Sequence, residues 1–263
     1  PRGWRRSLAP RSPAAELLDS ATRIAREARA LARRRREEGV TVAATKAAAA
    51  DIVTAADREV EAFVRAELER VLVRQSELPT FQDISTDVKT ISTDSGWKTF
   101  FLLGFGVKSE QNIAQCPETW RAVQKIPGLK TAMFSIFEPG KHLPSNRCPY
   151  NGGLRLHVGM IVPEPADKIA IRVKDQICHW QEGKALIFDD AYEHEAWNHT
   201  DKTRVVLFVD FDKPLKFPAR FVNWALMNLA VFTPFIREGL DNHKEWEKKF
   251  YAEAEAFRNR PQG

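Results

Sequence analysis

The sequence is poor in cysteine and has neither a long apolar run nor a phosphate-binding loop. Its three cysteines, Cys116, Cys148 and Cys178, are odd in number and far apart, which excludes a disulfide framework and indicates a cytoplasmic protein. The arginine-rich start lacks the apolar stretch of a signal peptide, so we expect no such peptide. A CxxC pair and a supported Ser/His/Asp arrangement are missing too, so these residues favour neither dithiol chemistry nor serine hydrolysis.

The composition is that of a globular protein with one sizeable core. The 263 residues are 43% hydrophobic and 10% aromatic. The net charge of +5 arises in residues 1–75, which hold 16 Lys and Arg against 11 Asp and Glu, whereas residues 76–263 hold 24 of each. Such an excess attracts phosphate, anionic lipid or nucleic acid. A solvated helical face explains it more simply, and we expect no nucleic-acid partner.

The N-terminal third predicts helices. Residues 1–13 are rich in Arg, Pro and Ser, residues 14–38 form an amphipathic pattern, and a second helix runs over 55–74 after the capping residue Thr54. The segment ATKAAAADIVTAADREVEAFV resembles the N-terminal helices of inositol-monophosphatase-like proteins, but the later carboxylate motifs of that family are missing. We interpret residues 1–75 as a basic helical remnant or fusion, and 76–263 as the functional domain with C-terminal helices.

From residue 80 onward, short β-rich runs alternate with turn signals, which indicates an antiparallel barrel or sandwich. The predicted strands are 98–103, 131–137, 153–162, 169–173, 185–188 and 204–211. Helices are expected around 109–125 and 219–239. The apolar stretch 221–236 is too short and too interrupted for a membrane span, and it either lies in a membrane interface or caps the barrel.

One histidine and one arginine stand out in the β-rich part. The run ALIFDD predicts a strand that delivers His194 to a strand end, and the next strand returns with Arg204. Imidazole binds Fe(II), and a guanidinium binds a carboxylate through two hydrogen bonds. An imidazole and a guanidinium that converge inside a barrel therefore suit a metal beside a dianionic ligand.

Several linked segments resemble the aspartyl/asparaginyl β-hydroxylase family, and most closely its bacterial lipid A hydroxylase branch. They cover about residues 76–252 and include WKTFFL, IPGLKTAMFSIFEPGKHLP, LRLHVGMIVPEP, HWQEGKALIFDDAYEHEAWN and RVVLFVDFDKPL. The resemblance implies a mainly β fold, a double-stranded β-helix (jelly-roll, cupin-like) with flanking helices. It also implies Fe(II) as the metal and 2-oxoglutarate as the cosubstrate.

The resemblance assigns roles to individual positions. His194 matches the iron-binding histidine of an FDDxxEHE motif. Arg204 matches the arginine that holds the distal carboxylate of 2-oxoglutarate, with Ser135 as its hydroxyl partner. Arg155 and His157 match the pair that contacts the oxalyl end of the cosubstrate.

The sequence departs from the family at the second iron-binding histidine, where it has Asn146. The family already lacks the carboxylate of the usual facial triad, so this change leaves His194 as the only strong protein ligand. Cys148 occupies the place of that missing carboxylate, and we expect it to be a bystander rather than a ligand. His142, four residues before Asn146, is a weak candidate for a replacement ligand.

The remaining candidates favour structural roles. We expect His179 and His199 on the surface, and Asp189 and Asp190 bracing the turn before His194. Trp180 and Trp197 are predicted to pack in the core.

The function that the resemblance implies is hydroxylation of a lipid A acyl chain, or of a related lipid, at its 2-position. This would occur on the cytoplasmic face of the inner membrane, with 221–236 as a peripheral membrane contact. Two alternatives stay open: hydroxylation of peptidyl Asp or Asn, and a catalytically silent domain that binds a carboxylate through Arg204 and Arg155. The oligomeric state is not predicted.

Overall fold

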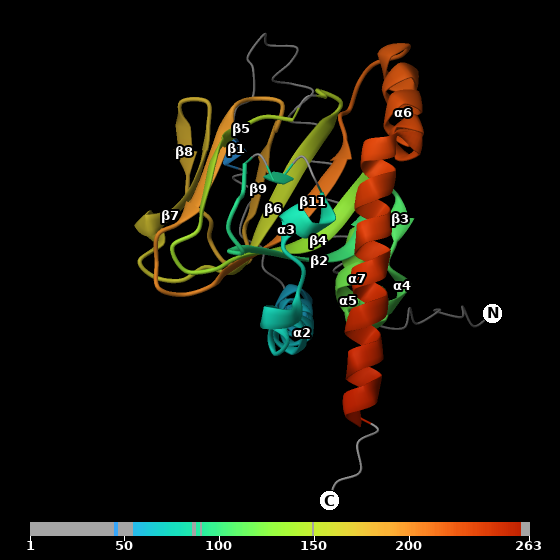
Figure 1. The fold of residues 1–263 in the computed structure, drawn as a ribbon. Coiled ribbons are helices and arrows are strands. Elements are labelled where there is room, and N and C mark those ends of the chain that lie inside the picture. The colour runs from blue at the N-terminus through green and yellow to red at the C-terminus, as the bar shows by residue number, and fades with distance from the viewer. Residues whose placement is uncertain (1–44, 47–54, 86–87, 90, 149, 259–263) are drawn as a thin grey trace, which may run out of the picture.

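The computed structural model describes residues 45–46, 55–85, 88–89, 91–148 and 150–258 (Figure 1). The expectations for residues 1–13, for a helix over 14–38 and for Thr54 lie outside the described residues. The strands are β1 (Thr45–Lys46), β2 (Trp97–Gly104), β3 (Val107–Lys108), β4 (Leu129–Phe137), β5 (His142–Asn146), β6 (Gly153–Ile161), β7 (Ile169–Val173), β8 (Gln176–Cys178), β9 (Ala185–Phe188), β10 (His194–Asn198) and β11 (Arg204–Asp212). The α-helices are α2 (Ala55–Leu72), α3 (Phe81–Ile84), α4 (Glu110–Gln115), α5 (Pro117–Val123), α6 (Ala219–Leu229) and α7 (Pro234–Arg258).

The strands form two antiparallel sheets that pack face to face. The larger sheet has the order β1-β9-β6-β11-β4-β2-β3, and the smaller has the order β5-β10-β7-β8. This confirms the predicted double-stranded β-helix with flanking helices. Figure 1 shows the smaller sheet on one side of the molecule and α7 running along the other side of the larger sheet.

The six predicted strands are all present, within two residues of their predicted bounds. The helix predicted over 109–125 is two helices, α4 and α5, because Pro117 begins a new helix directly after Cys116. The helix predicted over 219–239 is also divided: α6 ends at Leu229, and α7 begins at Pro234 and continues to Arg258. Strands β5, β8 and β10 were not predicted, since their sequences HLPSN, QIC and HEAWN are short and polar.

Each face of the larger sheet packs against a different partner. On the outer face, Phe100, Phe134 and Leu207 join a core cluster with Leu68 of α2 and Phe250 of α7. The inner face packs against the smaller sheet in a second cluster. Its members include Trp97, Phe137, Trp180, Phe188 and Val206, together with Ile169, Ile171, Val173 and Ala196 of the smaller sheet. Because both faces of β4 are covered, nearly all of its residues are buried.

Helix α2, which was predicted over 55–74, packs on the same core as the strands. Its Leu68 is fully buried. The buried carboxylate of Glu67 accepts hydrogen bonds from the N–H groups of Glu118 (2.8 Å) and Thr119 (3.0 Å) at the start of α5. These are donors that a helix leaves without an intrahelical partner. The proposed division of the chain at residue 75 stays a prediction.

Helix α7 carries a buried histidine. The ring of His243 lies 5.5 Å from the rings of both Phe101 and Trp246, centroid to centroid, and its Nε2 has no hydrogen-bond partner in the described part of the chain. Burial lowers the pKa of this imidazole to about 4 from an ordinary 6.5. The folded protein therefore holds His243 neutral over a pH interval in which the unfolded chain binds a proton.

This difference predicts an acid-sensitive contribution to stability. The contribution is complete above pH 6.5 and is lost as the pH falls toward 4, and it amounts to about 3 kcal/mol. We expect His243→Phe to remove this part of the pH dependence, measured by urea unfolding at several pH values. An equally steep loss of stability in the variant over the same interval would contradict the burial argument.

Candidate functional site

The side of β11 that faces the smaller sheet determines where the site residues lie along the barrel. Residues two apart on a strand point to the same face, so Arg204, Val206, Phe208 and Asp210 all face the smaller sheet, and Arg204 and Asp210 are roughly 20 Å apart. Neighbouring strands place further residues on this face. Ser135 pairs with Val206, His157 with Phe208, and Arg155 with Asp210. Four predicted site residues, Ser135, Arg155, His157 and Arg204, therefore line one inner face.

Arg204 is the deepest charged group of this face. Its side chain is 1% exposed, and its guanidinium carbon lies 3.8 Å from the ring centre of Phe137 and 4.6 Å from that of Trp180. Within the part of the chain that the structure describes, the guanidinium makes one hydrogen bond, a long one of 3.4 Å to the backbone oxygen of Ser135, and its Nε has no partner. Among the described residues, no carboxylate pairs with it, and burial lowers its pKa to about 9.

Ser135 and Trp97 complete the wall beside Arg204. The indole Nε1 of Trp97 donates a hydrogen bond of 3.0 Å to the Oγ of Ser135. The hydroxyl proton of Ser135 is therefore available to a ligand oxygen, while its backbone oxygen faces Arg204.

His157 lies in the middle of the inner face, and both of its ring nitrogens lack a partner among the residues that the structure describes. Its ring is surrounded by those of Trp180, Phe188 and Phe208, at centroid distances of 5.8, 5.1 and 5.1 Å. The pKa of His157 is well below its ordinary value, first because it is buried and then because Arg155, Arg204 and His194 add positive charge around it. His157 is therefore a neutral imidazole among three other site residues.

His194 comes from the opposite sheet and faces the same interior. It begins β10 rather than ending the preceding strand, and it is 4% exposed. Its Nδ1 donates to the backbone oxygen of Tyr192 over 2.9 Å, which leaves the lone pair on Nε2 for a ligand. Burial and the nearby Arg155 lower the pKa of His194. The five residues expected to meet in one cavity all face the space between the two sheets, and a shared cavity stays a prediction.

Asn146 is the cross-strand neighbour of His194 in the β5–β10 pair. Its amide Nδ2 donates to the backbone oxygens of Pro144 (2.9 Å) and His194 (3.2 Å). The side-chain oxygen is the group that stays available to a ligand. The structure thus places the departure from the family pattern directly beside the expected iron-binding histidine.

Arg155 is held by two carboxylates at the mouth of the barrel. Its guanidinium lies 2.8 Å from Asp210 and 2.9 Å from Asp190, and its pKa is raised by these two charges despite its burial. Asp210 was not among the predicted site residues. The sequence does contain a signal for it, because Asp210 follows Arg204 by six residues on one strand and therefore lies on the same face.

The turn before His194 is braced as expected. Asp189 accepts from the backbone N–H of Ala191 over 3.2 Å and pairs with Lys213 at 2.6 Å, while Asp190 pairs with Arg155. Both carboxylates therefore serve as supports.

The other candidates lie away from the interior or lack an activated group. His142 is about half exposed and lies 3.5 Å from Glu195, on the side of β5 that faces away from His194. The pKa of Cys148 is raised by burial and by Asp190, so its thiol stays protonated. His179 and His199 are on the surface as predicted.

Of the two tryptophans predicted in the core, Trp180 is there, at 1% exposure. The prediction was wrong for Trp197, because this residue alternates with the inward-facing Ala196 and Asn198 on β10. It is half-buried on the outer side, stacked on His199.

The donor set suits an anion better than a metal. Among the described residues, the Nε of Arg204 and both ring nitrogens of His157 are buried without a partner, and the Ser135 hydroxyl, which accepts from Trp97, can still donate its proton; a carboxylate site requires such donors. Within the described residues, no group of three or more His, Cys, Asp or Glu side chains is arranged to hold a metal ion. His194 would be one strong metal ligand, and Asn146 a weak second.

Comparison with known proteins gives a family and one very similar relative. The profile of the aspartyl/asparaginyl β-hydroxylase family matches residues 59–214. An ornithine lipid ester-linked acyl 2-hydroxylase of Rhizobium tropici is 87% identical over 198 residues, which cover 75% of this chain and 70% of that protein. The human aspartyl/asparaginyl β-hydroxylase is 34% identical over 123 residues, which cover 45% of this chain but only 16% of that protein.

Among solved structures, a Pseudomonas putida prolyl-4-hydroxylase matches with a TM-score of 0.38 and 17% identity. The match covers 58% of this chain and 87% of that one.

Proposed function

Because the chain belongs to the aspartyl/asparaginyl β-hydroxylase family, we propose that it is a 2-oxoglutarate- and Fe(II)-dependent hydroxylase of a lipid acyl chain. The substrate that we propose is an ornithine lipid, hydroxylated at the 2-position of its ester-linked chain, since that is what the name of the Rhizobium tropici relative states. This replaces lipid A as the first candidate. No observation on this chain favours a peptide substrate.

The buried, unpaired guanidinium of Arg204 is the observation that carries this proposal. A charge removed from water without a partner costs several kcal/mol, and no protein carboxylate offsets that cost among the described residues. A dicarboxylate that reaches Arg204 would supply the missing charge. In this arrangement Arg204 and Ser135 hold the distal carboxylate of 2-oxoglutarate.

The other end of the cosubstrate would lie toward the mouth of the barrel. The neutral His157 offers a ring N–H to the oxalyl group, and Arg155 lies two residues before it on β6. Arg155 already binds Asp190 and Asp210, which neutralise its charge, so it would line the mouth beside the oxalyl group without offering it a free pair of donors. His194 and Asn146 would hold the iron, which when bound supplies the oxidising chemistry for attack on a C–H bond.

Asn146 supports a second candidate function, a domain that binds the carboxylate and does not turn over. An amide oxygen is a weaker ligand than imidazole for a divalent transition metal. The anion site does not depend on this position, because the partners of the Asn146 side chain among the described residues are the backbone oxygens of Pro144 and His194. Anion binding and catalysis can therefore be tested separately.

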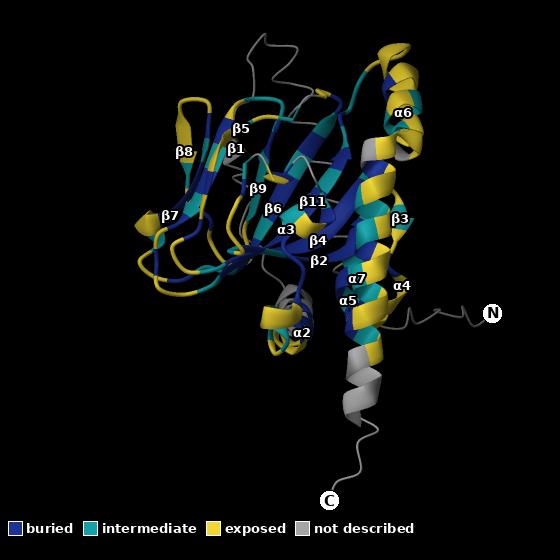
Figure 2. Ribbon diagram, viewed as in Figure 1, coloured by how far each residue is buried: buried dark blue, intermediate teal, exposed yellow. Residues whose placement is uncertain are grey.

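Membrane contact through α6 and the residues that follow it forms part of the proposal. Phe221, Trp224, Leu229 and Phe232 are each more than half exposed, and Figure 2 shows α6 as largely exposed. The chain has no acidic residue between Asp212 and Glu238, whereas Lys216 and Arg220 precede the apolar residues. Among the described residues, no helix has the length and apolar character to cross a bilayer. An interfacial position agrees with this pattern of aromatic and basic residues.

Substitution of Arg204 tests the anion site without catalysis. Saturating 2-oxoglutarate, at a hundred times its dissociation constant, should stabilise the native chain by about 2.7 kcal/mol. We expect Arg204→Met to abolish this stabilisation, measured by thermal unfolding, and to be at least as stable as the native chain without ligand, because it removes an unpaired buried charge. Arg172→Met, which removes an arginine on β7 that pairs with Glu193 and Glu195, should keep the ligand effect. An unchanged ligand effect in Arg204→Met would refute the assignment.

Restoring the imidazole tests the metal site. In Asn146→His we expect Fe(II)-dependent succinate formation to rise at least about tenfold, and the affinity for Mn(II), used as an inert probe, to rise by a similar factor. Even loss of a residue that only supports a metal ligand typically lowers metal affinity or activity by about tenfold or more. Ser145→His, on the adjacent and exposed position of β5, is the matched control and should change neither. If Asn146→His forms succinate and the native chain does not, the native chain is catalytically silent. If the native chain and Asn146→His form succinate at equal rates, the native chain is an active enzyme.

The membrane contact is tested by flotation with vesicles that contain anionic phospholipid. Each aromatic side chain that leaves the lipid phase costs about 1.5–3 kcal/mol, so Phe221→Ser with Trp224→Ser should weaken binding at least about tenfold. Ile177→Ser removes a similarly exposed apolar residue on β8 and should have no effect. Equal flotation of all three proteins would rule out α6 as the contact.

A further inference from the structure

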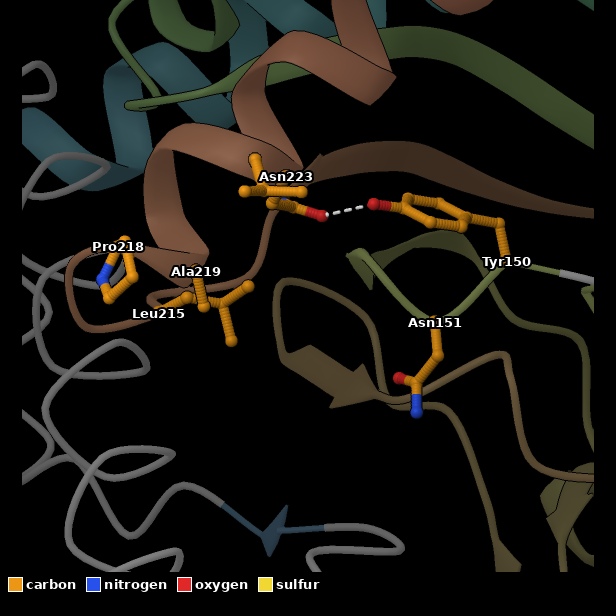
Figure 3. Close-up of a pocket in the computed structure, with 7 residues that line it drawn as sticks. Tyr150, Asn151, Leu215, Pro218, Ala219 and Asn223 are labelled. Atoms are coloured by element: carbon orange, nitrogen blue, oxygen red, sulfur yellow. Dashed lines mark hydrogen bonds between the residues drawn. The ribbon is translucent and has the colours of Figure 1, made fainter.

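A surface hollow lies between α6 and the loop that leads into β6 (Figure 3). Its volume is about 410 Å³, within the range of about 300–1,000 Å³ that ligand sites usually have. Leu215, Pro218, Ala219 and Val222 form an apolar wall on the α6 side. Tyr150 and Asn151 form the opposite side, as Figure 3 shows.

Hydrogen bonds from one buried residue hold the two walls together. The Oδ1 of Asn223 accepts from the hydroxyl of Tyr150 over 2.7 Å, and its Nδ2 donates to the backbone oxygen of Gly152 over 3.0 Å. Any Cβ at position 152 would lie only 2.1 Å from Asn223 Oδ1 and from the ring of Tyr150. The hollow is therefore a built feature, fixed to the first turns of the membrane-contacting helix.

The hollow adjoins the mouth of the barrel. The ammonium group of Lys213 lies 3.3 Å from the backbone oxygen of Asn151, and it also pairs with Asp189 at 2.6 Å. The next residue, Asp190, pairs with Arg155. One short network thus connects the lining of the hollow to the mouth of the site.

A second hollow, of about 430 Å³, lies beside Asn146 and is lined by charged side chains instead. It includes Arg147, Lys174, Glu193 and Tyr192, the last being the residue whose backbone oxygen accepts from His194. A polar hollow therefore lies next to His194, whereas the apolar one lies toward α6. This arrangement fits an amphiphile whose reacting carbon is next to its ester group. Its head group would lie in the polar hollow, and its apolar chain would point toward α6.

We propose that the apolar hollow lined by Tyr150, Ala219 and Val222 holds the methylene chain of the acyl substrate beyond the reacting carbon. The inference rests on the proposed function and adds the path of the chain, from the lipid phase at α6 to the mouth of the barrel. Tyr150 and Asn223 are positioning residues in this arrangement. They fix the wall against which the chain packs.

The test is photo-crosslinking, which requires no turnover. The probe is an ornithine lipid with a diazirine in the middle of its ester-linked palmitoyl chain, presented to the full chain in vesicles of neutral and anionic phospholipid. We expect cross-links to concentrate at the residues that line the hollow, which are Tyr150, Asn151, Leu215, Pro218, Ala219, Val222 and Asn223. Ala219→Trp fills the hollow and should reduce these cross-links about tenfold. This factor corresponds to the loss of binding energy from roughly two methylene groups of the chain that are no longer buried.

Ala225→Trp introduces the same side chain further along α6, outside the lining, and should leave the cross-links unchanged. Thermal unfolding of both variants checks that each is folded. Cross-links spread over Phe221 and Trp224, and unaffected by Ala219→Trp, would overturn the proposal by showing that lipid touches only the membrane face. Cross-links in the hollow, together with no succinate from Asn146→His, would support the chain site and count against the hydroxylase function instead.

Discussion

One buried cation governs the interior of this protein. Arg204 lies between the two sheets, against the rings of Phe137 and Trp180 and without a carboxylate partner among the described residues. Hydrophobic packing alone would favour a leucine or methionine at such a place. Under the proposed function an entering anion offsets this cost, and the packing around Arg204 then serves a ligand rather than stability. The neutral His157 and the hydroxyl of Ser135 follow from the same requirement, because both can donate to an anion.

The two ends of the barrel differ in how their charges are compensated. At the deep end, Asn198 closes the structure through hydrogen bonds to the backbone oxygens of Phe137, Glu138 and Lys202, and Arg204 stays without a counter-charge. At the mouth, Arg155 is neutralised by Asp190 and Asp210. This difference supports the orientation that we propose for the dicarboxylate, with its distal carboxylate at the deep end, where Arg204 has no counter-charge among the described residues.

The sequence predicted the parts of the site that depend on strand periodicity. The run RVVLFVDF predicts strand β11 because it is apolar and rich in β-branched residues. The alternation of faces along this strand also places Asp210 on the side of Arg204, although Asp210 was not among the predicted site residues. Strand β10 was not found, because HEAWN has an interior face made of His194, Ala196 and Asn198 and therefore lacks an apolar pattern. The outward position of Trp197 follows from the same register. The pairing of Arg155 with Asp190 joins residues 35 positions apart in the sequence, and the hollow at α6 needs Asn223 to meet Gly152. Contacts of this kind are fixed by tertiary packing, which local patterns do not contain.

The altered position, Asn146, has little effect on the rest of this architecture. The β5–β10 register still places residue 146 opposite His194, and the backbone around it is tied by the amide of Asn146 itself. The side chain of Asn146 makes no hydrogen bond to Arg204, Ser135 or His157 among the described residues. A substitution at position 146 therefore leaves the anion site folded. Under the proposed function, Asn146 in place of an iron-binding histidine therefore weakens the chemistry without disturbing the interior. The buried guanidinium, the neutral imidazole and the apolar hollow are the features on which the proposed dicarboxylate and acyl-chain sites rest, and none of them includes residue 146.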